Sequence, residues 1–155
     1  MLDVNNTLGW QSKTPQRSQL RLQTSATPSI DNIYTRTWTT LVQLIGQDIE
    51  YKKDAGYGDT IRVVTPGVYS ITYGDTSTSA GANFALVTNV TGSGGPSGEA
   101  KETLAVGYVA AANAPVQVIW TGYLEARTRI VPNNNHANVG SNAFAQILSI
   151  CKVSD

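Results

Sequence analysis

From residue 36 onward, the chain is a succession of short runs in which apolar and polar side chains alternate, separated by clusters of Gly, Pro, Asn and Asp. In one run, Tyr69, Ile71 and Tyr73 share a parity, and polar or smaller residues fill the positions between them. A period of two is that of a β-strand, whose successive side chains point to opposite faces of the sheet. The pattern predicts eight or nine strands, over residues 38–45, 47–53, 60–64, 67–73, 83–90, 103–111, 116–124, 125–131 and 143–153.

The last of these runs is apolar on both parities. A helix is the alternative, because Phe144, Ile147, Leu148 and Cys151 also fit a period of 3.6. We prefer a strand, since no helix cap precedes the run and Ile150 and Cys151 favour β structure. A strand with one solvated face would be polar on that face. We therefore expect the second face to be covered by the N-terminal segment or by a partner subunit.

Residues 1–33 are different in character: they are mainly polar, contain Pro15 and Pro28, and show no sustained period between residues 11 and 29. We interpret them as an extended N-terminal arm, followed by a single domain over residues 34–155; a disordered leader is the alternative. Apolar residues such as Trp10, Leu20 and Leu22 favour an arm that docks on a partner. The candidate partner-binding residues are Trp10, Lys13, Arg17 and Arg21.

Composition narrows the class of function. The chain has 155 residues, of which 14% are charged, and its formal net charge is zero. A neutral chain lacks the basic surface that grips nucleic acid or an anionic membrane. No apolar run is long enough to span a membrane, and the first residues do not resemble a signal peptide. Cys151 is the single cysteine, so no intrachain disulfide forms.

The sequence offers little for catalysis, and we expect no enzyme activity and no cofactor. His136 is the only histidine and lies in an Asn-rich loop without a nucleophile motif. The Gly-rich loop of residues 91–100 is not followed by the Lys-Ser/Thr of a phosphate-binding loop. The densest group of carboxylates suggests a solvated strand edge, with calcium as the alternative ligand: Asp48, Glu50, Asp54 and Asp59.

Aromatic residues suggest one further alternative, a sugar-binding site. Tyr57, Tyr73, Tyr108 and Tyr123 could stack on the apolar face of a glycan. Half-buried positions in a sheet are the preferred interpretation of the same residues.

Three segments between Asp59 and Val153 resemble the trimeric jelly rolls of the tumour necrosis factor and complement globular-head superfamily. They are GDTIRVVTPGVYSITY, TGYLEARTRIVPNNN and the terminal AFAQILSICKV. In the second segment, Ala126 and Arg127 stand where that superfamily usually has Gly-Asp. The resemblance implies an all-β antiparallel jelly-roll sandwich that forms a homotrimer. It also implies that the terminal strand lies near the threefold axis, with Phe144, Ile147, Leu148 and Ile150 at the interface.

A jelly roll of this size with an extended polar arm resembles phage and viral structural proteins. We therefore predict a virion protein, made in the host cytoplasm, that decorates a capsid and binds the shell or other virion proteins through its arm. The alternative is the receptor-binding head of a spike or tail fibre that recognises a host glycan or protein. A glycan-active enzyme is a more remote alternative.

Overall fold

The computed structural model describes residues 17–24, 29–30, 36–53, 59–89, 102–134 and 145–155. Within these residues there are twelve β-strands and no helix. The strands are β1 (Gln19–Gln23), β2 (Ser29–Ile30), β3 (Arg36–Thr37), β4 (Thr40–Ile45), β5 (Ile49–Lys52), β6 (Thr60–Val63), β7 (Gly67–Thr76), β8 (Asn83–Asn89), β9 (Glu102–Tyr108), β10 (Pro115–Leu124), β11 (Arg129–Asn134) and β12 (Ile147–Ser154).

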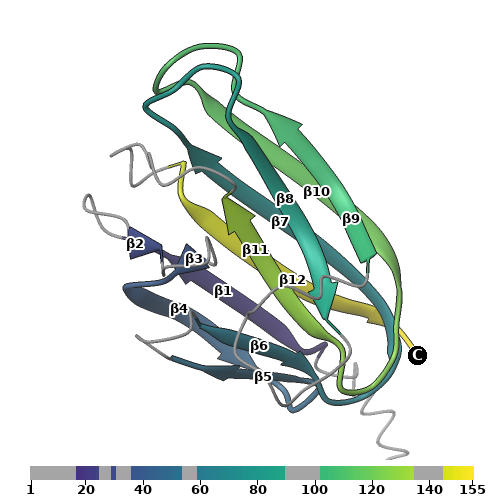
Figure 1. Cartoon of the computed structure of the whole chain (residues 1–155). Coiled ribbons are helices and arrows are strands. Elements are labelled where there is room, and N and C mark those ends of the chain that lie inside the picture. Colours follow the sequence, from purple (N-terminus) through teal and green to yellow (C-terminus); the bar gives the residue numbers. More distant parts are fainter. Residues whose placement is uncertain (1–16, 25–28, 31–35, 54–58, 90–101, 135–144) are drawn as a thin grey trace, which may run out of the picture.

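Ten of the strands form two five-stranded sheets that pack face to face (Figure 1). One sheet has the order β10-β7-β12-β1-β4 and the other β5-β6-β11-β8-β9, and β2 pairs with β3 beside them. All neighbouring pairs are antiparallel. The prediction of an antiparallel jelly-roll sandwich is confirmed, and each of the nine predicted runs overlaps a strand.

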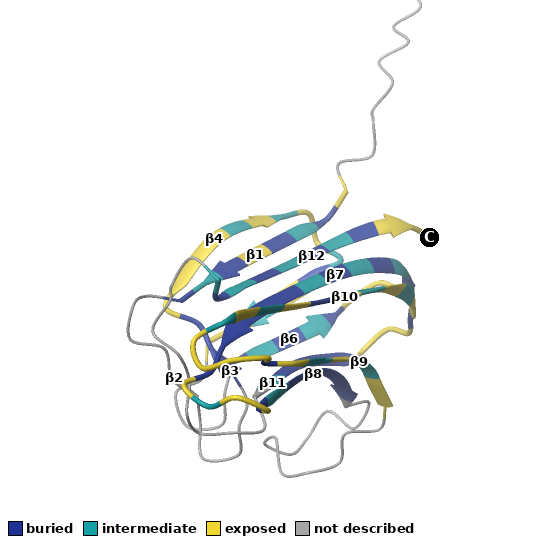
Figure 2. Cartoon of the chain, turned by 90° about the horizontal axis from the view of Figure 1, so that it is seen from above, coloured by how far each residue is buried: buried dark blue, intermediate teal, exposed yellow. Residues whose placement is uncertain are grey.

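Alternation places the core between the sheets. Burial alternates along the strands, as Figure 2 shows, and Tyr69, Ile71 and Tyr73 of β7 share one face as predicted, which is the buried face. Tyr73 packs edge-on between Trp38 and Phe84, with ring centroids 6.2 Å apart in both pairs. Edge-to-face contact is a preferred arrangement of aromatic rings, so these pairs stabilise the packing of the two layers.

Strand β1 corrects the predicted boundary at residue 33. Gln19–Gln23 was assigned to the arm, but it lies inside the first sheet, hydrogen-bonded to β12 on one side and to β4 on the other. Leu20 and Leu22 are completely buried in the common core. The segment forms a strand because Leu20 and Leu22 alternate with polar residues and bury one apolar face, although the residues on either side of it are polar. Residues 1–16, the rest of the predicted arm before β1, lie outside the described residues.

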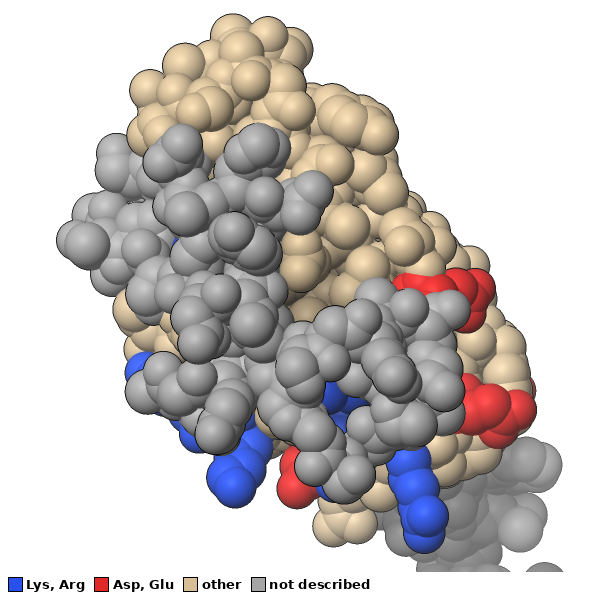
Figure 3. Space-filling view, in the orientation of Figure 1, with Lys and Arg blue, Asp and Glu red and all other residues tan. Residues whose placement is uncertain are grey.

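Both ends of the sandwich carry charged residues, but the turns after β7 and β9 do not. Gln19 pairs with Cys151 near the chain's C-terminal end, and Arg17 and Asp155 lie at that end. The opposite end carries the turns after β7 and β9, whose exposed residues include Ala80, Ala110 and Asn113. On the face seen in Figure 3, the Lys, Arg, Asp and Glu side chains lie in the middle and lower parts of the view, and the described atoms visible at the top belong to other residues.

Candidate assembly interface

The outward face of the first sheet is the strongest candidate for an interaction surface. Cross-strand register places β10, β7 and β12 residues in rows: Ile119, Thr72 and Ser149 form one row, and Thr121, Ser70 and Cys151 form the next. The hydroxyl of Thr121 donates to Ser70 Oγ at 3.1 Å, which ties two of the strands on this outer side. Residues opposite one another in an antiparallel pair share a face, so these rows cover the sheet's outer surface.

Among the described outward positions of β10, β7 and β12, none is charged. They are Pro115, Gln117, Ile119, Thr121, Tyr123, Val68, Ser70, Thr72, Gly74, Thr76, Ile147, Ser149 and Cys151. Two large apolar side chains stand out on β10, where Ile119 is 64% and Tyr123 is 56% exposed. The solvent face of an antiparallel sheet is normally polar, and a face this poor in charge is typical of a surface that another protein covers.

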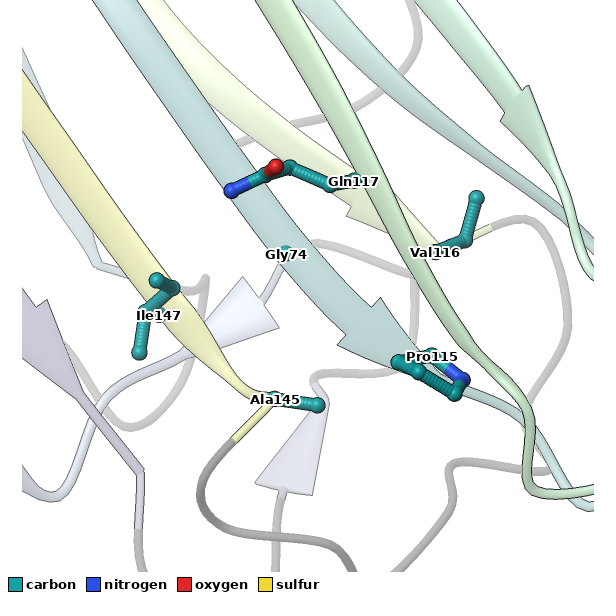
Figure 4. Close-up of a pocket in the computed structure, with 6 residues that line it drawn as sticks. All are labelled: Gly74, Pro115, Val116, Gln117, Ala145 and Ile147. Carbon is teal, nitrogen blue, oxygen red and sulfur yellow. The ribbon is translucent and has the colours of Figure 1, made fainter.

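A hollow of about 330 Å³ opens on this face where β7 ends and where β10 and β12 begin (Figure 4). Gly74, Pro115, Val116, Gln117, Ala145 and Ile147 line it. A Cβ atom at Gly74 would lie 2.7 Å from the carbonyl oxygen of Ala145, closer than real contacts allow. The glycine therefore permits the chain that leads into β12 to pass against β7. Because Gly74 has no side chain, the surface of β7 is hollowed at this position.

The predicted interface residues divide between the two faces of β12. Ile147 lies on the outward face and lines the hollow, as an interface residue should. Leu148 and Ile150 are corrected, because both are 0% exposed in the single chain and pack in the intersheet core. A partner subunit could contact them only if the sandwich opened. Phe144 lies outside the described residues.

Of the predicted partner-binding residues, Arg17 and Arg21 are described and exposed, whereas Trp10 and Lys13 lie outside the described residues. Arg21 is on the outward face of β1, in register with Ser149. Arg17 lies before β1, at the sandwich end that holds the C-terminal residues. The structure therefore does not bring these two cations together at one point.

Ile119 and Tyr123 were missed as candidate site residues. The most apolar parity of the same strand is the other one, which holds Val116, Val118, Trp120 and Leu124. Val118 and Leu124 are buried. The signal for the interface was the opposite parity, on which a large apolar and an aromatic residue alternate with uncharged polar ones. A strand that is apolar on both parities predicts that both of its faces are covered.

A polar cluster fastens the beginning of β1 to the end of β12. Ser18 Oγ donates to Asp48 Oδ2 at 2.6 Å, and the backbone N–H of Asp48 donates to Ser18 Oγ at 3.0 Å. Lys152 Nζ lies 3.4 Å from Asp48 Oδ1 and 2.6 Å from Asp155 Oδ1. The hydrogen bond from Ser18, aided by the charge of Lys152, holds the pKa of Asp48 below its ordinary value.

A second polar cluster lies inside the core. The guanidinium of Arg36 lies over the ring of Trp38, 5.9 Å from its centroid, and Tyr73 Oη donates to Asp75 Oδ2 at 2.8 Å. Burial raises the pKa of Asp75, although the positive charge of Arg36 opposes that effect. These groups are enclosed and bonded to one another, so the cluster is structural and offers no surface to a substrate.

The carboxylates considered for calcium are separately engaged. Asp59 accepts hydrogen bonds from the Trp38 backbone N–H at 2.8 Å and from Tyr51 Oη at 2.7 Å. Glu50 lies 3.6 Å from Arg62, and Asp48 belongs to the cluster with Lys152. Asp54 lies outside the described residues. In the described part of the chain, no group of three or more His, Cys, Asp or Glu could hold a metal ion.

The tyrosines considered for a sugar site do not gather. Tyr73 is buried in the core, Tyr108 is exposed on the other sheet, and Tyr123 lies on the outward face of the first sheet. This corrects the shared sugar site, because the two exposed rings belong to different layers. Tyr57 and His136 lie outside the described residues. Across the described ranges, no helix has the length and hydrophobicity needed to cross a membrane.

The chain matches no family model, and no curated protein is similar to it in sequence. Solved structures, by contrast, share its fold. Murine APRIL at pH 5.0 is 16% identical with a TM-score of 0.64, over 88% of this chain and 99% of APRIL. Eiger TNF from S. frugiperda is 11% identical with a TM-score of 0.63, over 90% of this chain and 94% of Eiger. GITRL from bushbaby is 12% identical with a TM-score of 0.57, over 90% of this chain and 96% of GITRL. The chain thus has the jelly-roll fold of these TNF-family proteins.

Proposed function

We propose that this protein is a non-catalytic structural subunit of a virion, a homotrimer that decorates a capsid. The observation that carries the proposal is the uncharged outward face of the β10-β7-β12 strands. Its centre holds small side chains such as Ser70, Gly74 and Ser149, which let another backbone approach closely, and its margin holds Ile119 and Tyr123. In a trimer this face would bury its apolar side chains and leave no charge desolvated.

The TNF-family fold of the similar structures agrees with the resemblance to trimeric jelly rolls seen in the sequence. That resemblance implies a trimer, so the fold supports trimerisation. The position of the face also agrees with that implication, because β12, the terminal strand, runs through the middle of the first sheet. Binding by assembly needs no catalytic group. The polar clusters around Asp48 and Asp75 are satisfied within the chain, which supports a role in adhesion rather than in chemistry.

The decoration role rests on the division of the sandwich into two different ends. The chain enters β1 at Arg17 beside Asp155, so a docking arm over residues 1–16, with Trp10 as its anchor, would meet a neighbouring subunit or the shell at that end. The uncharged turns of the opposite end would then face outward. Many weak contacts per particle, multiplied by three subunits, suit a cement function.

The alternative, a receptor-binding head, draws support from the same outward turns. Exposed small residues such as Ala80, Ala110 and Asn113 would present backbone groups to a host glycan or protein. The number of copies on an isolated particle separates the two roles. Copies spread over the whole shell support decoration, and copies confined to a vertex or tail support a binding head.

Sedimentation tests the trimer directly. We expect the native chain to sediment at about three times its mass of 16.5 kDa, and Ile119→Lys to sediment as a folded monomer because it places a charge in the buried face. The matched control is Tyr108→Lys, which changes an equally exposed apolar residue on the other sheet. A native monomer, or an Ile119→Lys trimer, would refute the proposed interface.

A further inference from the structure

Strand β4 is a free edge of the first sheet with an open apolar side. Among the described strands it pairs only with β1, and none of its residues is charged. Leu41 and Leu44 lie in register with the fully buried Leu22 and Leu20, yet they are 47% and 42% exposed. The core side of β4 is therefore uncovered at this margin of the sandwich.

An edge of this kind needs a partner. A free edge presents unpaired backbone N–H and C=O groups, and proteins usually protect it with charged residues, proline or a bulge. Strand β4 has only a register irregularity, opposite Arg21 and Leu22, and Val42 is also exposed there. An added strand would supply backbone hydrogen bonds to β4, and its apolar side chains would cover the leucines.

The chain itself contains a segment with the required pattern. In residues 2–10, LDVNNTLGW, the even positions carry Leu, Val, Asn, Leu and Trp, and the odd positions carry Asp, Asn, Thr and Gly. A period of two with one apolar face is the signature of a strand at the margin of a core. We propose that residues 2–10 of one copy add as a strand to the β4 edge of a second copy, with their apolar face against Leu41 and Leu44.

The place where the chain enters β1 bears on which copy accepts the arm. Arg17 lies beside Lys152 and Asp155, at the end of the sheet where β12 and β4 both end, because Gln19 pairs with Cys151 on one side and with Ile45 on the other. Ser18 is held there, because its carbonyl accepts a hydrogen bond from the Lys152 backbone N–H at 2.9 Å and its hydroxyl bonds to Asp48. A return to the chain's own β4 would have to pass around the turn at Asp48, and a second copy needs no such turn.

This inference rests on the proposed function, because self-assembly supplies the second copy, and it gives the arm a defined acceptor. Disulfide trapping between two versions of the full chain tests it, both in a Cys151→Ser background. One version carries Asn5→Cys, on the polar parity of the arm, and the other carries Gln43→Cys, on the outward side of β4. After co-expression and mild oxidation, we expect a disulfide-linked dimer that contains one chain of each version.

Scanning the arm cysteine through residues 3, 5 and 7 allows for the register of the added strand. The matched control places the acceptor cysteine at Thr103, an exposed residue of β9 at the edge of the other sheet, where we expect no linked dimer. Adding Leu44→Lys to the Gln43→Cys version should lower the linked fraction at least about tenfold, because a charge on this edge blocks strand addition.

Sedimentation of the same proteins separates the two proposals. If the protein is a trimer but no arm position links to Gln43→Cys, strand addition is refuted and the trimer stands. A third version carries Asn5→Cys and Gln43→Cys in one chain. If its link forms only within that chain, docking on a second copy is also refuted. A monomer in sedimentation refutes the proposed trimer instead, whatever the linked fraction. Equal linkage to Thr103→Cys would show chance collision and would overturn the inference.

Discussion

Arg36 and Asp75 form an ion pair from which solvent is completely excluded. Arg36 Nε lies 3.0 Å from Asp75 Oδ2, Arg36 Nη2 donates to Oδ1 at 3.1 Å, and both side chains are 0% exposed. The pair joins the short strand β3 to the inner face of β7. Removing two charges from water is costly, and the geometry offsets that cost by two-point contact and by further hydrogen bonds to the carboxylate from Tyr73 and from the backbone of Thr76.

Breaking this pair should destabilise the fold strongly. We expect Arg36→Met to lower the free energy of unfolding by about 3–5 kcal/mol, because the Asp75 carboxylate stays buried without its cation. Urea denaturation measures the change. The double variant Arg36→Met/Asp75→Leu should recover much of the loss, since no charge is then buried. The control is Arg62→Ala, which breaks the exposed pair with Glu50 and should cost no more than about 1 kcal/mol.

Strand β1 makes a second prediction. Leu22→Ala should lower the free energy of unfolding by about 2–5 kcal/mol, because the leucine is completely buried. Arg21→Ala, which changes an exposed residue on the opposite face of the same strand, should stay within about 0.5 kcal/mol of the native value. Removal of residues 1–16 should leave a folded protein, whereas removal of residues 1–24 should not. A folded product of the longer deletion would contradict the place of β1 in the sheet.

Gly74 tests the close approach of two strands. We expect Gly74→Ala to lower the free energy of unfolding by about 1–3 kcal/mol, because its new methyl group would overlap the carbonyl oxygen of Ala145. Thermal or urea unfolding measures the loss. Ser149→Ala, a change of similar size on the same face, should have little effect. A neutral Gly74→Ala variant would show that the start of β12 moves freely.

The cluster of Ser18, Asp48 and Lys152 predicts a sensitivity to acid. Because the folded state lowers the pKa of Asp48, that state binds fewer protons there than the unfolded chain. The stability contributed by this carboxylate is present above its unfolded pKa, near 3.8, and is lost as the pH falls below it. Thermal melts between pH 7 and pH 3 should therefore decline less steeply for Asp48→Asn than for the native chain. Equal slopes would contradict this assignment.

Local alternation accounts for most of the sandwich. Residues 67–73 and 116–124 each carry one mainly apolar parity between clear turn signals, and they form the adjacent strands β7 and β10. Strand β1 escaped because its signal is only Leu20 and Leu22 within a polar stretch. The strand that contains these leucines is held by hydrogen bonds to β12 and β4. Because β12 is remote in the sequence, the local pattern alone did not predict the strand.

The candidate interface was predicted in part and for a specific reason. Sequence shows that β12 is apolar on both parities, but it does not show which parity faces the other sheet. Only the assembled register assigns Leu148 and Ile150 to the core and Ile147 to the surface. The pairing of Arg36 with Asp75 was equally inaccessible, because it depends on the packing of strands that are distant in the sequence.

The pairing of β1 with β12 also constrains how the protein can form. Gln19 meets Cys151 across almost the whole length of the chain, so the centre of the first sheet closes only after the last strand has left the ribosome. Contacts of such high sequence separation slow folding, because the loop between them must lose its freedom first. Until then the unpaired edges of β1 and β7 stay available to neighbouring chains. We therefore expect productive refolding to be slow and to lose yield as protein concentration rises.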